Sequence, residues 1–189
     1  MPSLPELACE RSGVTADKAF AIDDEDAKLY DKLGQDTFVK LSTEFYNRVY
    51  DDSEPVDAGG SQPVPFNSIF SKFTKESAIR NQYEFVIQRL GGPPLYSQRK
   101  GHPALMARHS QLPCTEASAE RYMVHMGEAL KAVPEIDGDA AERLYNYFRH
   151  TCFFLAVGQE VMQQRRVQWP PQQQGQHQQQ AQAAEQMGQ

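Results

Sequence analysis

One histidine of the chain, His109, stands in surroundings that could do chemistry. The stretch Leu95–Thr115 around it has no Asp or Glu, although it carries the cations Arg99, Lys100 and Arg108. In a chain whose formal net charge is −6, this stretch is a local cationic patch. Imidazole is a common metal ligand, and Lys and Arg bind anionic groups. The setting therefore singles out His109 among the five histidines of the sequence.

The residues before His109 add an apolar face. Leu105 and Met106 stand four and three positions before it, on the same side of a helix. This combination suits an iron porphyrin, because imidazole ligates the iron, apolar side chains cover the macrocycle and Lys or Arg pairs with the propionates. The residues alone also allow the ordinary role of a lone histidine, which is to be solvated or hydrogen-bonded within the structure.

Other catalytic and binding patterns are absent from the sequence. It has no G-x-S-x-G, H-E-x-x-H, P-loop or Rossmann fingerprint, and no two histidines stand four residues apart. The sequence therefore does not indicate hydrolase or dinucleotide chemistry of these kinds, or a zinc site on one helix.

The composition narrows the class of protein. The 189 residues allow one domain with tails, and 40% of them are hydrophobic, which is enough for a core. Residues 164–189 carry +1, so the rest carries −7, which argues against binding to nucleic acid or to an anionic membrane. The sequence has no apolar run long enough for a membrane span and no secretory or transit signal, and its three scattered cysteines fit a reducing compartment. We expect a cytoplasmic protein.

Apolar residues recur at helical spacing along most of the chain, which predicts amphipathic helices around one shared core. The predicted helices run from Thr37 (capped by Asp36) to about Tyr50, from about Lys75 to Leu90, from near Pro103 to before Pro113, from the cap Thr115 to about Ala132, and from Asp137 or Asp139 onward. Asp51–Pro65 holds three prolines and a Gly-Gly pair and is predicted to be a loop. No segment alternates with a period of two for long, so the predicted fold class is all-α.

The helix predicted at Lys75–Leu90 has two apolar stripes. One consists of Ile79, Tyr83, Val86 and Leu90, and the other of Ala78, Gln82 and Phe85. A helix covered on two sides lies between the core and a second partner, which is either another helix or a flat ligand.

The C-terminal stretch differs in composition from the rest. From Gln163 onward 13 of 27 residues are Gln, with few large apolar groups to offset the entropy of ordering. We predict that this stretch is disordered. It contains the only tryptophan, Trp169, which leaves open a role as a partner-binding segment.

Several motifs together resemble one family. They are Thr43-Glu44-Phe45-Tyr46, Phe85 through Gly91-Gly92-Pro93, Tyr96-Ser97-Gln98-Arg99-Lys100-Gly101-His102-Pro103, and Arg108-His109. At these spacings the chain resembles the truncated (2-on-2) haemoglobins of group II, in their plant and green-algal branch, from about Ala19 to Met162. The resemblance implies a sandwich of two antiparallel helix pairs around haem b. It divides the chain into an N-terminal extension (1–26), a truncated globin domain (27–163) and a Gln-rich tail (164–189).

The resemblance also implies roles for individual residues. His109 matches the proximal iron ligand, Tyr46 the distal tyrosine and Phe70 the aromatic residue that wedges the haem edge. By the resemblance, Phe45 and Phe85 would be further pocket walls, and Tyr96 with Arg99 or Lys100 would be the propionate anchor. Ala78 stands where full-length globins often have a distal histidine, and Gln82 lies one turn further along. From its place on the face of His109, Met106 is also expected in the pocket.

The chain departs from the family pattern at three places. Tyr122 stands where group II members usually have a tryptophan, and a phenol can both donate and accept a hydrogen bond. The loop Asp51–Pro65 is longer than usual, which predicts a more mobile pocket edge. The usual Gly-Gly pair before the second family helix is reduced to Gly34-Gln35.

These matches set expectations about function. Haem with one histidine ligand leaves a site for oxygen, nitric oxide or carbon monoxide, so the family places the chain among oxygen-binding and oxygen-transport proteins. Hydrogen bonds from Tyr46, Gln82 and Tyr122 would slow oxygen release, which suits oxygen chemistry, scavenging or sensing better than transport. The sequence leaves open whether the chain has side activity as a nitric oxide dioxygenase or peroxidase. It also leaves open whether a reductase is a partner, and whether the chain is a monomer or a homodimer. The alternative is a haem-regulated helical interaction module whose Gln-rich tail binds a partner.

Overall fold

The structure of the chain is a computed structural model, and it describes residues 2–23 and 29–168. It divides into a unit that ends at Gln159 and a second unit that begins at Glu160, and the features below belong to the first. The predicted disorder from Gln163 was wrong for residues 163–168, which form the end of a long helix. The rest of the Gln-rich tail, including Trp169, lies outside the described residues, so its predicted disorder stays a prediction. Within the described ranges, no helix is both long enough and apolar enough to cross a membrane.

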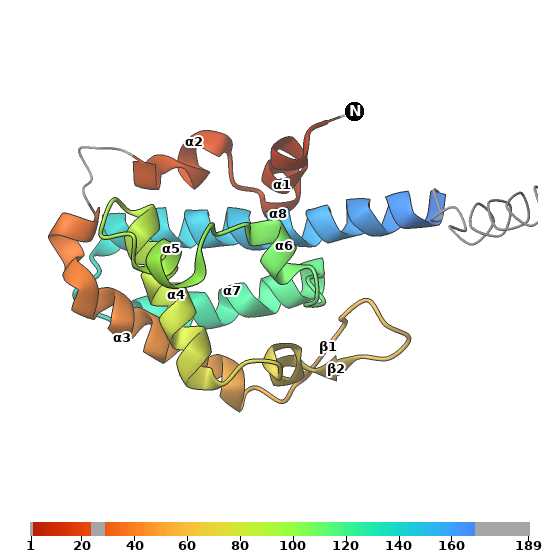
Figure 1. The fold of residues 1–189 in the computed structure, drawn as a ribbon, viewed down its shortest axis with the longest axis horizontal. Helices are drawn as coiled ribbons and strands as arrows, with labels where there is room; N and C mark the ends of the chain where they lie inside the picture. Colours follow the sequence, from red (N-terminus) through yellow and green to blue (C-terminus); the bar gives the residue numbers. More distant parts are fainter. Residues whose placement is uncertain (1, 24–28, 169–189) are drawn as a thin grey trace, which may run out of the picture. The chain divides into compact units, whose positions relative to one another are not determined.

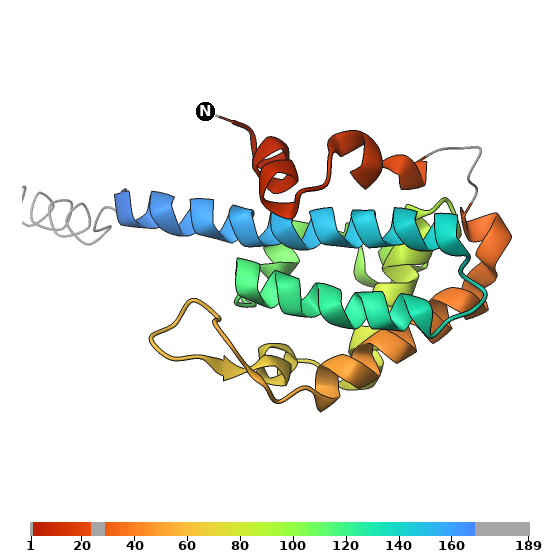
Figure 2. The ribbon, with the colours of Figure 1, turned by 180° about the vertical axis from the view of Figure 1, so that it is seen from behind.

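Two pairs of helices form the body of the first unit (Figures 1 and 2). Helix α3 (Leu29–Asp51) packs on α4 (Lys75–Arg89), and α7 (Glu116–Lys131) runs antiparallel to α8 (Gly138–Gln168). Their facing sides meet in a core whose largest fully buried side chains include Phe38, Phe45, Ile87, Met123, Met126 and Leu144. The all-α class and the two-on-two sandwich predicted from the sequence are confirmed.

Helix α3 begins earlier than predicted and has a kink. Gly34 has a φ of 73° and a ψ of 167°, a conformation that residues with a side chain rarely adopt. Leu33 and Thr37 bridge the kink, because the Thr37 hydroxyl donates to the Leu33 carbonyl over 2.6 Å. The second part of α3 begins directly after Gly34, so Asp36 already lies in helical backbone and is not the cap before Thr37 that the sequence predicted.

The three longer predicted helices are confirmed to within a few residues, and two of the predicted caps are present. Thr115 accepts a hydrogen bond from the Ser118 N–H over 3.1 Å at the start of α7. Asp137, the first of the two alternatives, accepts from the Ala140 N–H over 3.0 Å before α8. At the end of α4, Gly91 takes a φ of 82°.

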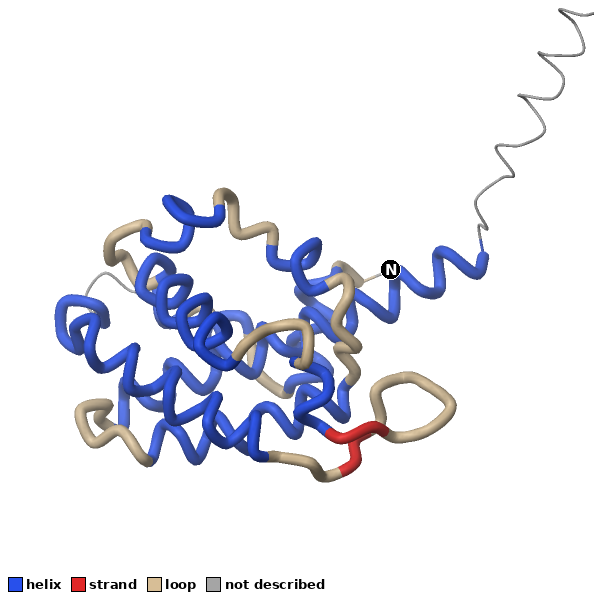
Figure 3. Tube along the Cα trace, turned by 60° about the horizontal axis from the view of Figure 1, so that its bottom comes forward, coloured by secondary structure: helices blue, strands red, loops and turns tan. Residues whose placement is uncertain are grey.

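The segments that connect the long helices differ from the prediction in three features. Helix α5 (Leu95–Lys100) was not predicted, and α6 (Leu105–His109) begins two residues later than expected, after Ala104 with a φ of 41°. In the predicted loop, β1 (Pro55–Val56) pairs antiparallel with β2 (Val64–Pro65), which Figure 3 shows at the base of the loop. The short helix η2 (Phe66–Phe70) follows.

The N-terminal extension packs on the body. Its helices α1 (Leu4–Ser12), α2 (Ala16–Ala19) and η1 (Ala21–Asp23) lie along α8 on the side away from α7 (Figures 1 and 2). The contacts include Arg149 donating to the Ser12 carbonyl over 2.7 Å and Arg143 donating to the Ala21 carbonyl over 2.8 Å.

A buried carboxylate ties the end of α3 to α7. Asp52, whose side chain is 4% exposed, accepts hydrogen bonds from the Arg121 guanidinium at 2.6 and 2.9 Å. Its Oδ2 is also 2.6 Å from Nε2 of His125. The hydrogen bonds from Arg121 hold the pKa of Asp52 well below its usual range, so this carboxylate stays ionised and paired at neutral pH.

Candidate functional site

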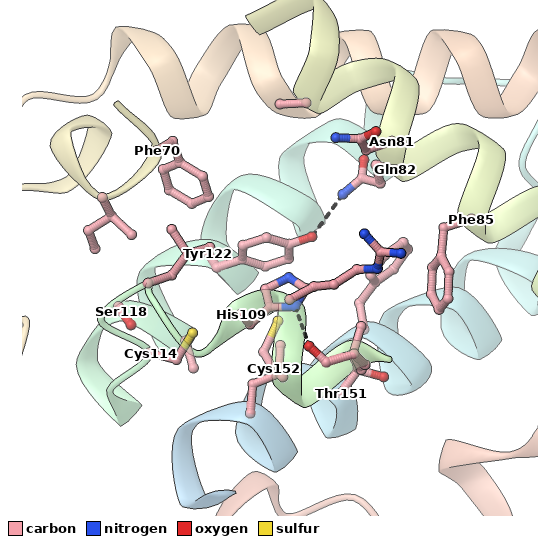
Figure 4. Close-up of a pocket in the computed structure, with 18 of the residues that line it drawn as sticks. Phe70, Asn81, Gln82, Phe85, His109, Cys114, Ser118, Tyr122, Thr151 and Cys152 are labelled. Carbon is pink, nitrogen blue, oxygen red and sulfur yellow. Dashed lines mark hydrogen bonds between the residues drawn. The ribbon is translucent and has the colours of Figure 1, made fainter. Parts of the chain in front are cut away.

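A cavity of about 430 Å³ lies between α4, α6, α7 and α8, and most of its wall is apolar (Figure 4). Nine of the twelve residues predicted for the site lie on this wall: Tyr46, Phe70, Ala78, Gln82, Phe85, Tyr96, Lys100, His109 and Tyr122. The structure therefore brings together residues that are as far apart in the sequence as 46 and 122.

The wall residue best suited to bind a metal is His109, the last residue of α6. Its Nδ1 lies 2.8 Å from the Leu105 carbonyl oxygen, one helical turn earlier (Figure 4). Because a carbonyl only accepts, Nδ1 carries the proton and Nε2 keeps its lone pair. Burial lowers the pKa of His109, which keeps the ring neutral. A neutral imidazole with a fixed tautomer is the form that ligates iron.

Three polar side chains from different helices face the same cavity. Gln82 on α4 donates from Nε2 to the Tyr122 hydroxyl oxygen on α7 over 2.8 Å (Figure 4). Within the described part of the chain, the buried Oε1 of Gln82 has no hydrogen-bond partner, and the structure records none for the Tyr46 hydroxyl. Burial raises the pKa of both tyrosines, so both phenols keep the protons they can donate. An orphaned buried polar atom indicates a missing partner inside the cavity.

Two aromatic contacts shape the walls. Phe45 is fully buried, with its ring 4.8 Å from that of Tyr46 and 4.4 Å from that of Tyr122. It supports these two residues from behind and is not on the cavity wall, unlike its predicted role as a pocket wall. Phe85 is on the wall and meets Tyr96 edge to face at 5.8 Å.

The cationic edge of the cavity differs in one residue from the prediction. Lys100 and Arg108 are on the wall, and the Arg108 guanidinium stacks over the Tyr96 ring at 5.5 Å. Arg99 turns away and donates from Nε to the buried Glu84 carboxylate over 2.8 Å. A carboxylate that is 5% exposed needs such a partner, which explains why Arg99 is not at the cavity.

The role of Arg108 was missed in the sequence, although this residue was counted in the cationic patch. It directly precedes His109, and its guanidinium also donates to the His102 carbonyl oxygen over 3.0 Å. The sequence signal for this role is that Arg108 stands directly before the candidate ligand His109 at the end of one short helix.

Met106 does not line the cavity either. A side chain at Gly158 of α8 would place its Cβ 2.3 Å from the Met106 Cε, so Met106 packs against the bare backbone there. Leu105 lines the cavity together with His109, because residues four positions apart lie on the same face of a helix. Met106, three positions before, is rotated toward α8.

Two cysteines that the sequence did not single out for the site lie on the wall. Burial raises the pKa of Cys114 to about 11, and burial raises that of Cys152 further. Both thiols are therefore neutral at pH 7 and act as part of the apolar lining.

Comparison with known proteins agrees with this fold. The bacterial-like globin family matches residues 28–154. The chain is 51% identical over 164 residues to group 2 truncated hemoglobin 3-1 of Lotus japonicus, covering 87% of this chain and 91% of the relative. It is 52% identical over 164 residues to two-on-two hemoglobin-3 of Arabidopsis thaliana, covering 87% of each chain.

Solved structures show the same architecture. The truncated oxygen-avid haemoglobin from Bacillus subtilis superposes with a TM-score of 0.54 at 32% identity, covering 67% of this chain and 96% of the other. The group II truncated hemoglobin from Bacillus anthracis gives a TM-score of 0.56 at 27% identity, covering 67% and 88%.

The two-on-two helical fold, with a mostly apolar cavity that His109 lines, is that of a globin. This chain belongs to the bacterial-like globin family and, within it, to the group 2 truncated haemoglobins. Membership of the globin family implies haem binding.

Proposed function

We propose that the chain binds haem b through Nε2 of His109 and takes oxygen, or another diatomic molecule such as nitric oxide, on the side of Tyr46, Gln82 and Tyr122. When bound, haem supplies an iron with one coordination position open to such a molecule. The observation that carries the proposal is the hydrogen bond from His109 Nδ1 to the Leu105 carbonyl, which leaves Nε2 free in a mostly apolar cavity.

The remaining wall residues suit the shape and charge of haem b. Phe70, Phe85 and the other apolar residues would cover the macrocycle and exclude water from it. Lys100 and Arg108 are the cations at the cavity, so they would pair with the two propionates. Tyr96 lies beneath the Arg108 guanidinium and supports this edge.

The polar side chains supply hydrogen-bond donors for a bound diatomic molecule. The Tyr46 hydroxyl is one donor. A half-turn of the Gln82 amide would let the Tyr122 hydroxyl donate to Oε1 and turn the Nε2 protons toward the cavity. These donors would hydrogen-bond a diatomic ligand that carries negative charge, and a hydrogen bond to a charged group contributes about 1.5–3 kcal/mol. We therefore propose slow oxygen release, which supports a role in oxygen chemistry, scavenging or sensing. The family match favours this function over that of an interaction module.

Haem titration of two histidine variants tests the proposal. His109→Ala removes the ligating nitrogen, and we expect it to weaken haem binding strongly. His102→Ala is the matched control, because His102 belongs to the same cationic patch but is exposed, and its Nδ1 accepts only the Ala104 N–H over 3.1 Å. Wild-type haem affinity and spectrum in His109→Ala, with loss in His102→Ala, would overturn the assignment.

A further inference from the structure

One side-chain amide on α8 holds the chain segment that directly follows the candidate iron ligand. Gln159 donates from Nε2 to the carbonyl oxygens of His109, over 2.8 Å, and of Leu112, over 2.7 Å. Its Oε1 accepts the Cys114 N–H over 3.2 Å. Both protons of the amide and one of its acceptor positions are therefore used on a single six-residue stretch.

That stretch has little structure of its own to hold it. Helix α6 has five residues, barely more than one turn, so its position depends on tertiary contacts. Beyond His109 the chain makes one short turn, in which the Leu112 N–H donates to the His109 carbonyl over 2.9 Å. Pro113 then removes a donor. Within the stretch the Cys114 N–H also donates to the Leu112 carbonyl over 2.9 Å, and the Gln159 amide joins these backbone groups to α8.

The residue next to Gln159 brings α6 close to the same place. A Cβ at Gly158 would stand 2.3 Å from Cε and 2.9 Å from Sδ of Met106, so the glycine lets α6 lie directly on the α8 backbone. Gly158 and Gln159 together form a docking point for α6, with an apolar contact before the ligand and a hydrogen-bonded contact after it.

We infer that Gln159 is a positioning residue for His109. The His109 ring is fixed to its own helix by the bond from Nδ1 to Leu105, so it moves wherever α6 moves. Gln159 fixes the end of α6 to the long helix α8 and thereby sets where Nε2 stands in the cavity. The inference rests on the proposed function for the consequence that Gln159 controls the iron–histidine bond and haem retention.

The test compares Gln159→Met with Gln163→Met in the full-length, haem-loaded protein. Methionine has nearly the length of glutamine but no amide, and Gln163 is an exposed glutamine further along α8. We expect Gln159→Met to shift the iron–histidine stretching band in the resonance Raman spectrum of the ferrous protein. We also expect haem transfer to excess apomyoglobin to be about tenfold faster, which corresponds to about 1.4 kcal/mol. Gln163→Met should match the wild type in both.

Amide hydrogen exchange at Cys114 supplies a readout that does not depend on haem. We expect this amide to exchange faster in Gln159→Met, because the variant removes one of its two acceptors and leaves the carbonyl of Leu112 as the other. If Gln159→Met does not fold, Gln159→Asn replaces it, because its amide is one methylene too short to reach all three partners. A band, transfer rate and exchange rate equal to those of the control would overturn the inference. Absence of an iron–histidine band in the wild type would instead overturn the proposed function. Exchange at Cys114 would still test whether Gln159 holds the stretch that follows His109.

Discussion

The Tyr46 hydroxyl offers the cleanest perturbation of the oxygen site. It faces the cavity, and the structure records no hydrogen bond from it to any described residue, so it is available to a bound ligand. Tyr46→Phe deletes this donor with almost no change of volume. Loss of one hydrogen bond to a charged partner costs about 1.5–3 kcal/mol, which corresponds to roughly tenfold to over a hundredfold in the dissociation rate. Because Gln82 and Tyr122 remain, we expect the lower end, about tenfold faster oxygen release.

Stopped-flow mixing of the oxygenated protein with excess carbon monoxide measures this rate. Tyr83→Phe is the matched control, because Tyr83 lies on α4 next to Gln82 but does not line the cavity. We expect the control to release oxygen at the wild-type rate. An unchanged rate in Tyr46→Phe would refute the reasoning and would mean that the other two polar residues hold the ligand alone.

Three further predictions follow from the same contacts. Because Gln82 and Tyr122 share a 2.8 Å hydrogen bond, Gln82→Leu and Tyr122→Phe should change the oxygen dissociation rate non-additively, and additive effects would show that the pair is not coupled. The folded-state pKa of Asp52 is lowered, so its stabilisation is present above the unfolded pKa of about 3.9 and is lost as the pH falls. Asp52→Asn should therefore lower the free energy of unfolding by about 2 kcal/mol at pH 7 and by progressively less as the pH is lowered from about 4 toward 2, measured by urea denaturation, and a loss that does not change over this range would contradict this. Truncation after Met162 should leave haem affinity and the visible spectrum unchanged, and a loss of haem affinity would contradict the division at the Gln-rich tail.

The sequence predicted the helices that carry long apolar stripes and clear caps. Thr115 and Asp137 are side chains whose oxygen atoms satisfy the first free N–H groups of a helix, so the starts of α7 and α8 were visible in the sequence. Helix α5 has six residues, which is too short for an apolar stripe to appear. The start of α6 depends on Ala104 in a left-handed conformation, which no residue pattern indicates for alanine. The first predicted helix was expected to start at Thr37, whereas the structure has its break at Gly34 and a further helical segment from Leu29 before it.

The residues of the site were harder to place than its helices. The resemblance indicated which residues belong near the haem, and nine of them share one cavity wall. Arg99 and Met106 point elsewhere because of partners that are distant in sequence, the buried Glu84 and the bare backbone of Gly158. Gln159 gave no signal, because one glutamine just before a Gln-rich tail does not stand out by composition. Such contacts depend on how helices are rotated against each other, and the sequence pattern does not specify that rotation.

The central claim is that Nε2 of His109 is the protein ligand to haem iron. Resonance Raman spectroscopy of the ferrous protein, in the wild type and in His109→Gly with and without added imidazole, tests it most directly. We predict an iron–histidine stretching band in the wild type, its absence in His109→Gly, and a band from the exogenous ring when imidazole is added. A wild-type band in His109→Gly without imidazole would contradict the claim.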